Sequence, residues 1–185
     1  WWRADDMQYA KYGMTWLDNF YHGKGALVVY TSEGVKTWLL RFPGDTMNVF
    51  SWEKGSSNIK TGDFNGDGIS DLAYIDENGN DQLVIYKYGF GLTAPIPFGT
   101  GPCISLTSGD FNNDGNIDLA SCAMDMVSVI FGLGNAQFGS AVTYVLPGAT
   151  GVGGIESLDM NNDGALDLIV VNENDYVYIL YGSPT

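Results

Sequence analysis

Three nine-residue segments of the chain share one spacing of oxygen-bearing side chains. Each has the form Asp-x-Asn-x-Asp-Gly-x-x-Asp, and they begin at Asp63, Asp110 and Asp159. Side-chain oxygens stand at positions 1, 3, 5 and 9, position 7 offers its backbone carbonyl, and the glycine at position 6 permits a sharp turn. Calcium takes ~6–8 oxygen ligands, which such a loop supplies. The sequence therefore predicts three Ca²⁺ sites, with the ligands Asp63, Asn65, Asp67, Ile69 and Asp71, then Asp110, Asn112, Asp114, Asn116 and Asp118, then Asp159, Asn161, Asp163, Ala165 and Asp167.

Other metals and other loop types fit these segments less well. Zinc prefers His or Cys ligands, which the loops lack, and magnesium keeps its waters in a strict octahedron. An EF-hand needs a bidentate acid at position 12, where this chain has Tyr74, Ser121 and Val170. Asp-Asn-Gly clusters also form plain hairpin turns, but three copies of one ligand spacing favour metal binding.

The charge distribution also favours a cation. The chain has 22 Asp and Glu against 8 Lys and Arg, for a net charge of −14. The last base is Lys87, and residues 88–185 carry ten acids and no base, so this half repels itself unless something neutralises it. The same balance argues against a nucleic-acid partner. No apolar run reaches the ~18–20 residues of a membrane-spanning helix, so a membrane span is excluded.

The elements that must position the loops are short strands. Apolar runs such as Leu83–Tyr86 and Val127–Phe131 follow the loops, are rich in β-branched and aromatic residues, and end at Gly, Asn, Asp or Pro. The first acids of the loops are 47 and 49 residues apart, which leaves room for about four strands in each repeat. We therefore expect an all-β fold, a β-propeller of about four blades with four antiparallel strands each.

The expected blades divide a single domain, residues 1–185. Blade 1 would span 11–54 and lack a metal loop, blade 2 would span 55–100, blade 3 101–149, and blade 4 150–185 together with 1–10. Blade 4 ends without a fourth strand, so the N-terminal segment is expected to supply it and close the ring. The alternative is a ring completed by another chain. The chain begins at Trp1 with no Met or signal peptide, so either an export signal was removed or this is a piece of a longer protein.

Little in the sequence indicates catalysis. The single histidine, His22, lies in a turn-like segment, and there is no nucleophile elbow, zinc-protease motif or phosphate loop. The acids outside the loops are scattered, so we expect no enzyme and no catalytic residue. Cys103 and Cys122 flank the second loop, and a disulfide and two buried thiols both stay open. All five Trp fall within residues 1–52, which favours either a binding surface or packing between blades.

The three loops, with residues 127–138 (VSVIFGLGNAQF) and 177–182 (VYILYG), resemble FG-GAP repeats, also called VCBS-type repeats. Such repeats occur in the propellers of integrin α-subunits and in many secreted bacterial and fungal proteins. The resemblance covers residues 55–185 well and 1–54 poorly. It implies calcium in the hairpin between the first two strands of a blade and a secreted setting, extracellular or periplasmic. Integrin and most lectin rings have more blades than 185 residues can form, so their partner sites are not carried over.

The expected function is therefore a calcium-binding extracellular propeller that acts as a non-catalytic interaction or adhesion module, with a protein or glycan as its ligand. The alternatives are a carbohydrate-binding lectin, and an accessory or catalytic domain of a secreted polysaccharide-active enzyme.

Overall fold

The computed structural model describes residues 13–21, 24–31, 34–39, 49–52, 58–76, 82–87, 91–98 and 105–183. Within these ranges the regular structure consists of antiparallel β-strands, which confirms the all-β prediction for this part of the chain. Residues 1–12 lie outside the described residues, so the proposed closing strand at 1–10 stays a prediction.

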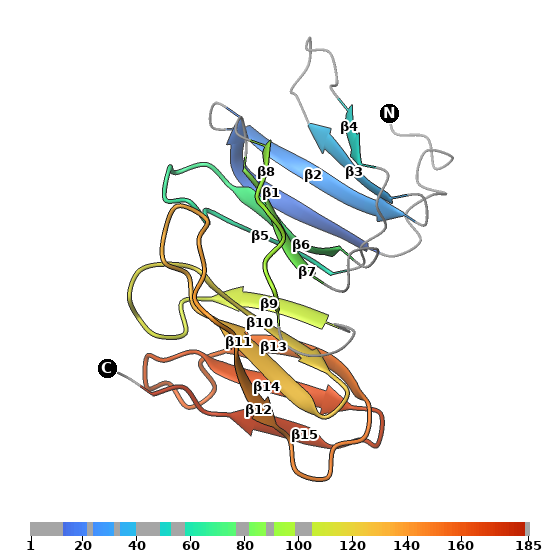
Figure 1. Ribbon diagram of the computed structural model, residues 1–185, viewed down its shortest axis with the longest axis vertical. Helices are drawn as coiled ribbons and strands as arrows, with labels where there is room; N and C mark the ends of the chain where they lie inside the picture. The colour runs from blue at the N-terminus through green and yellow to red at the C-terminus, as the bar shows by residue number, and fades with distance from the viewer. Residues whose placement is uncertain are drawn as a thin grey trace.

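The strands form four sheets, and in each sheet the spatial order follows the order in the chain (Figure 1). The first sheet contains β1 (Gly13–Tyr21), β2 (Lys24–Thr31), β3 (Gly34–Leu39) and β4 (Val49–Trp52). The second contains β5 (Ile59–Gly62), β6 (Asp71–Asp76), β7 (Gln82–Lys87) and β8 (Gly91–Leu92). The third contains β9 (Ser105–Gly109), β10 (Asp118–Ala123), β11 (Met126–Ile130) and β12 (Val142–Val145). The fourth contains β13 (Val152–Leu158), β14 (Asp167–Asn172) and β15 (Val177–Leu180).

Along the long axis of the molecule, the first sheet is followed by the second, and the third and fourth sheets overlap at the far end (Figure 1). Their first strands are in contact one after another, β1 with β5, β5 with β9, and β9 with β13. Among the described strands no contact of similar extent joins β13 back to β1, and the first and fourth sheets lie at opposite ends (Figure 1). The described residues thus form a row of sheets in which the first and last do not meet.

Two apolar cores hold the second, third and fourth sheets together. Successive side chains of a strand point to opposite faces, so Leu119 enters the core shared with the second sheet while Ala120 enters the core shared with the fourth. Because both faces are covered, β10 is buried along its whole length, which explains why only small and apolar residues follow Asp118 in it. The second–third core includes Ile75, Leu83, Ile85, Phe98, Leu106, Leu119 and Ile130. The third–fourth core includes Ala120, Cys122, Val127, Val129, Ile155, Leu168 and Val170.

Candidate metal-binding loops

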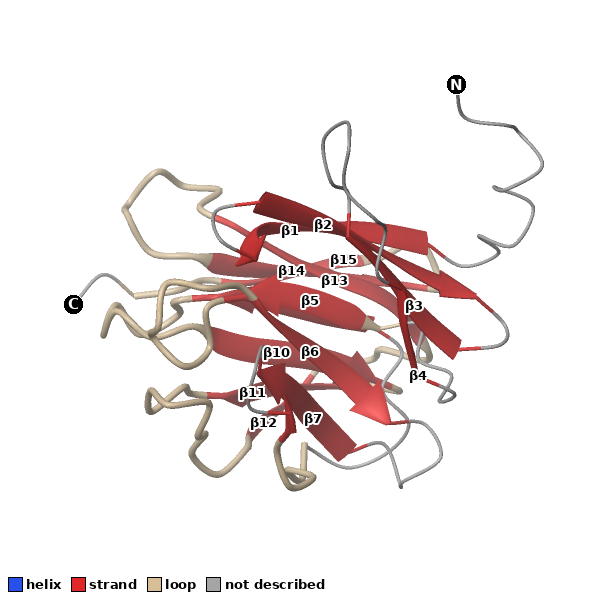
Figure 2. Cartoon of the chain, turned by 90° about the horizontal axis from the view of Figure 1, so that it is seen from above, coloured by secondary structure: helices blue, strands red, loops and turns tan. Residues whose placement is uncertain are grey.

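The three acidic segments connect the first two strands of the second, third and fourth sheets. Residues 63–70 join β5 to β6, residues 110–117 join β9 to β10, and residues 159–166 join β13 to β14. All three loops leave their sheets on the same side of the molecule (Figures 1 and 2). The ninth residue of each segment is already the first residue of the second strand, so it lies at the base of the loop rather than at its tip.

The first aspartate of each segment organises its loop by accepting backbone N–H groups. Asp63 Oδ1 accepts the N–H groups of Gly66 and Asp67 at 2.8 and 3.0 Å, and its Oδ2 accepts that of Gly68 at 2.8 Å. Asp110 and Asp159 accept the corresponding position-5 and position-6 N–H groups at 2.9–3.1 Å. The chain must turn tightly around this carboxylate.

This tight turn explains the residue types at positions 4 and 6. Both positions have a positive φ in every loop, between 56° and 90°. Glycine adopts this conformation without strain, and asparagine tolerates it better than most residues do. Position 6 is therefore always Gly, and position 4 is Gly66, Asn113 or Asn162.

The side chains at positions 3 and 5 extend the same pattern. Asn112 Oδ1 accepts the N–H of Asp114 at 3.0 Å, and Asp114 Oδ1 accepts the N–H of Asn116 at 2.8 Å. The Asn112 amide also donates to Asp114 Oδ2 at 2.9 Å. The N–H of Asn116 and then the Asn112 amide lower the pKa of Asp114, because they stabilise the charged form. The other two loops repeat these bonds at positions 3 and 5.

The position-9 aspartates, Asp71, Asp118 and Asp167, are fully buried. Asp118 Oδ2 accepts the N–H of Phe111 at 2.8 Å, and its Oδ1 accepts the N–H of Gly132 at 2.7 Å. Burial raises the pKa of Asp118, these two N–H groups partly offset that rise, and the charges of Asp114 and Asp110 add to it.

Asp167 makes the matching bonds, from Met160 N–H at 3.0 Å and Gly182 N–H at 2.9 Å. In the third and fourth sheets, the position-9 carboxylate therefore ties the loop to the end of the third strand of its own sheet.

The glycines that meet these carboxylates cannot carry a side chain. A Cβ on Gly132 would lie 2.4 Å from the backbone oxygen of Ile117, and one on Gly182 would lie 2.4 Å from that of Leu166. The pairs Phe131-Gly132 and Tyr181-Gly182 thus end in a glycine because the backbone of the loop passes directly beside it. The sequence interpretation gave these glycines no role, although they recur 14 and 15 residues after the position-9 aspartates.

The loops also join neighbouring sheets. The position-8 side chain of one loop lies over a glycine of the neighbouring sheet, the residue directly before that sheet's own acidic loop. A Cβ on Gly62 would lie 2.7 Å from Ile117 Cδ1, and one on Gly109 would lie 2.5 Å from Leu166 Cδ1. The second and third sheets are further joined by the N–H of Ala136, which donates to the oxygen of Phe64 at 2.8 Å. Contacts of the position-8 side chains therefore join the second sheet to the third and the third sheet to the fourth.

The donor chemistry of the loops suits a hard cation, since every candidate ligand is an oxygen. Within the described residues, however, no three Asp, Glu, His or Cys side chains come together in a group that would hold a metal ion. The carboxylates accept N–H groups of their own loops instead. Asp63 Oδ1 accepts two N–H groups, while the carboxylate oxygens of Asp110 and Asp159 accept one each and keep a further lone pair. Coordination of a metal by these oxygens is therefore compatible with the bonds of the loop once the side chains draw together.

Comparison with known families identifies the repeat. The family model described as "FG-GAP-like repeat" matches residues 63–121 and 110–170, more than half of the chain. The chain belongs to this family. Both matches begin at the first aspartate of an acidic loop, so the FG-GAP repeat contains the loop, the strands after it and the next loop. The resemblance inferred from the sequence is confirmed. No curated protein matches the chain.

Among solved structures, the chain is similar in fold to a chain of the crystal structure of BBS1N in complex with ARL6DN, soaked with mercury. The TM-score is 0.61 at 16% sequence identity, and the match covers 90% of this chain and 49% of the other. At this identity the likeness concerns the fold alone. The FG-GAP chain spans about half the length of the chain that it matches.

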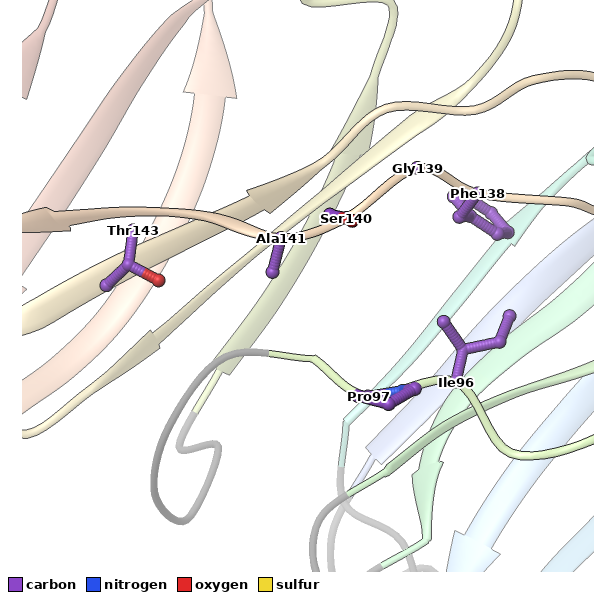
Figure 3. Close-up of a pocket in the computed structure, with 7 residues that line it drawn as sticks. All are labelled: Ile96, Pro97, Phe138, Gly139, Ser140, Ala141 and Thr143. Carbon is purple, nitrogen blue, oxygen red and sulfur yellow. The ribbon is translucent and has the colours of Figure 1, made fainter.

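A second feature is a shallow hollow of about 580 Å³ between the second and third sheets (Figure 3). Its lining residues include Ile96, Pro97, Phe138, Ser140 and Thr143, and none of the residues that line it is ionisable. It therefore offers two hydroxyl groups and apolar surface, but no acid or base for catalysis.

The remaining sequence-predicted residues are placed as follows. Cys122 is a buried free thiol, while Cys103, His22, Trp1 and Trp2 lie outside the described residues. No helix in the described part of the chain is long and apolar enough to cross a membrane.

Proposed function

We propose that this FG-GAP chain is a calcium-stabilised propeller segment that acts as a non-catalytic interaction module in an extracellular or periplasmic setting. The observation that supports it is the threefold recurrence of one oxygen-rich loop, with the same hydrogen bonds at positions 1, 3 and 5. These hydrogen bonds shape each loop, and the oxygens that form them are also of the kind that calcium takes as ligands.

In each loop, the side chains at positions 1, 3 and 5 would supply oxygen ligands from the exposed side of the loop. The carbonyl of Ile69, Asn116 or Ala165 would supply another at position 7. The position-9 aspartate would add a ligand from the base while it keeps its backbone bonds. Bound calcium would supply positive charge that offsets the like charges of each loop in a half of the chain that has no base.

Calorimetric titration of the metal-free protein with Ca²⁺ tests this proposal. We expect about three sites per chain, each with oxygen-only coordination. Asp114→Ala removes an oxygen donor from the second loop and should reduce the number of sites by one. A titration without binding heat at millimolar Ca²⁺ would contradict the calcium assignment.

Asp125→Ala is the matched control. Asp125 is an acid of the same sheet, in the turn between β10 and β11, and it is outside the acidic loop. It changes the net charge as Asp114→Ala does and should leave the number of sites unchanged. An equal loss in both variants would mean that the titration reports general charge neutralisation.

The proposed partner is a protein or a glycan. The similar fold was crystallised as a complex of BBS1N with ARL6DN, which is in keeping with a binding role. The hollow beside Phe138 combines apolar surface with the hydroxyl groups of Ser140 and Thr143, a lining that also suits a sugar. A glycan array separates the two partner classes, since a lectin gives saturable binding there and a protein-binding module does not.

A further inference from the structure

The outer face of the fourth sheet is apolar and exposed. In β14 and β15 the side chains alternate, so that Leu168 and Val170 enter the third–fourth core while Val171, Val177 and Ile179 face away from it. The exposed fractions of these three side chains are 44%, 60% and 37%. Large apolar side chains that share one exposed face usually mark a surface that binds another protein.

The equivalent positions of the third sheet are buried by the fourth sheet. The buried Asp–Gly pairs, Asp118 with Gly132 and Asp167 with Gly182, align the two repeats. In this alignment Ile169, Val171, Val177 and Ile179 correspond to Ala120, Cys122, Val127 and Val129. The exposed fractions of these four residues of the third sheet do not exceed 4%. The outer face of the fourth sheet therefore continues the row of sheet-to-sheet interfaces.

Leu158 indicates which kind of sheet fits this face. In the second and third sheets the residue before the loop is Gly62 or Gly109, and the position-8 side chain of the next loop lies on it. In the fourth sheet this residue is Leu158, whose side chain is 56% exposed. A neighbouring sheet with an acidic loop would bring its position-8 side chain against Leu158. The sheet that fits best has no such loop.

The first sheet meets this requirement. β1 ends at Tyr21 and β2 begins at Lys24, so two residues connect them where the other sheets have eight. The first sheet of the same molecule lies at the opposite end of the row (Figure 1) and contacts the second sheet, not the fourth. The first sheet of a second copy of the chain is not held at that end and can approach the fourth sheet.

Charge also favours the first sheet of a second copy over its fourth sheet. Residues 150–185 carry six acids and no base, whereas residues 1–54 hold six of the eight bases of the chain with six acids. Even with calcium in the loops and Glu156 paired with Lys60, Glu173 and Asp175 of each fourth sheet have no nearby base in their own segment. Two fourth sheets face to face would bring these like charges together, which opposes association. The fourth sheet on the first sheet avoids this repulsion.

We infer that the outer face of the fourth sheet is a docking surface for the first sheet of a second copy, so that two chains associate head to tail. Related by a twofold axis, two copies form this contact twice and leave no end of the row free, as in other closed cyclic oligomers.

Sedimentation velocity of the calcium-loaded chain, residues 1–185, tests the association. From about 1 to 100 μM the chain is expected to shift from monomer to dimer. Val177→Asp would bury an unpaired carboxylate in the contact and should raise the dimer dissociation constant at least ~100-fold. Val145 lies on β12, outside this surface, and its side chain is 64% exposed. Val145→Asp introduces the same charge at a solvent-exposed position and should leave the dimer intact. A wild-type monomer throughout, or a dimer that Val177→Asp leaves unchanged, overturns the proposal.

Energy transfer identifies the face of the partner. All five Trp lie within residues 1–52, so a label on the fourth sheet reports the approach of a first sheet. In a Cys103→Ser, Ser183→Cys variant labelled with a Trp-matched acceptor, the head-to-tail pair should show transfer that rises with dimer formation. If the transfer efficiency in the dimer equals that of the dilute monomer, the dimer forms by contact between two fourth sheets. This result would overturn the assignment.

Discussion

At the scale of single residues, the position-9 aspartates connect the acidic loops to the sheets. Asp118 has both carboxylate oxygens engaged by backbone N–H groups, from Phe111 and from Gly132. The sequence predicted this side chain as a metal ligand, and that role stays a prediction. Its bond to Gly132 joins residues 14 apart across the sheet, and the ligand spacing alone contains no sign of that contact.

Gly132→Ala is predicted to destabilise the fold, because its Cβ would press on the backbone oxygen of Ile117 at 2.4 Å. Neither group is the end of a flexible side chain, so the turn must shift and its bond to Asp118 must weaken. We expect a loss of about 1–3 kcal/mol in the free energy of unfolding, measured by urea denaturation.

Gly139→Ala is the control for this substitution. A Cβ at Gly139 would have one neighbour, the oxygen of Phe131 at 3.8 Å, which is an ordinary contact. Equal stability losses in the two variants would mean that the close approach of Gly132 to the loop has no special importance.

Cys122 is predicted to be unreactive in the folded protein. Burial raises the pKa of its thiol from 9.0 to about 11. A shift of two units lowers the thiolate fraction near pH 8 by roughly 100-fold, and the third–fourth core also excludes the reagent. In a Cys103→Ser variant, a thiol reagent should label Cys122 after denaturation and not before. Rapid labelling of the native protein would contradict the burial of Cys122 between these sheets.

At the scale of elements, the strands and loops were predictable because their signals are local. The apolar runs and the Asp-Asn-Gly segments are adjacent in the sequence. In the structure each such segment is the loop of a hairpin, and the flanking runs are its strands. The pairing of Gly109 with Leu166 was not predictable in this way. It joins residues of two different repeats, and only the folded sheets bring them together.

Leu166→Ala is predicted to weaken the coupling between the third and fourth sheets, because its side chain lies over Gly109. For a partly buried leucine we expect a loss of about 1–2 kcal/mol, less than the range for full burial. Hydrogen exchange should become faster in β13–β15 than in β5–β7. Leu133→Ala, an exposed leucine in the loop after β11, should change neither stability nor exchange.

At the scale of the whole molecule, the sequence predicted the class and the repeat, and left the arrangement of the repeats open. The all-β class and the FG-GAP repeat are confirmed. Closure of a four-blade ring by residues 1–10 stays a prediction, since that segment lies outside the described residues. Closure depends on the small rotation between neighbouring sheets, which many weak contacts set together and no motif encodes.

Removal of calcium is predicted to lower the melting temperature of the whole chain. At a Ca²⁺ concentration ~100-fold above the dissociation constant, each site stabilises the folded state by roughly 2.7 kcal/mol. For a chain of this size each kcal/mol shifts the melting temperature by about 2–4 °C. Calorimetry should show that the chelator lowers the melting temperature by a large amount and that excess Ca²⁺ restores it. A melting temperature that is indifferent to the chelator would refute calcium stabilisation.

The row of sheets has a mechanical consequence. The strand-to-strand contacts between sheets join neighbours, and beyond them an exposed ion pair at 3.5 Å, Lys60 with Glu156, links the second sheet to the fourth. A pulling force applied at the C-terminus would therefore load the third–fourth interface before any other. In a single-molecule extension the fourth sheet should detach first, with a force peak of its own, while the earlier sheets still carry the load.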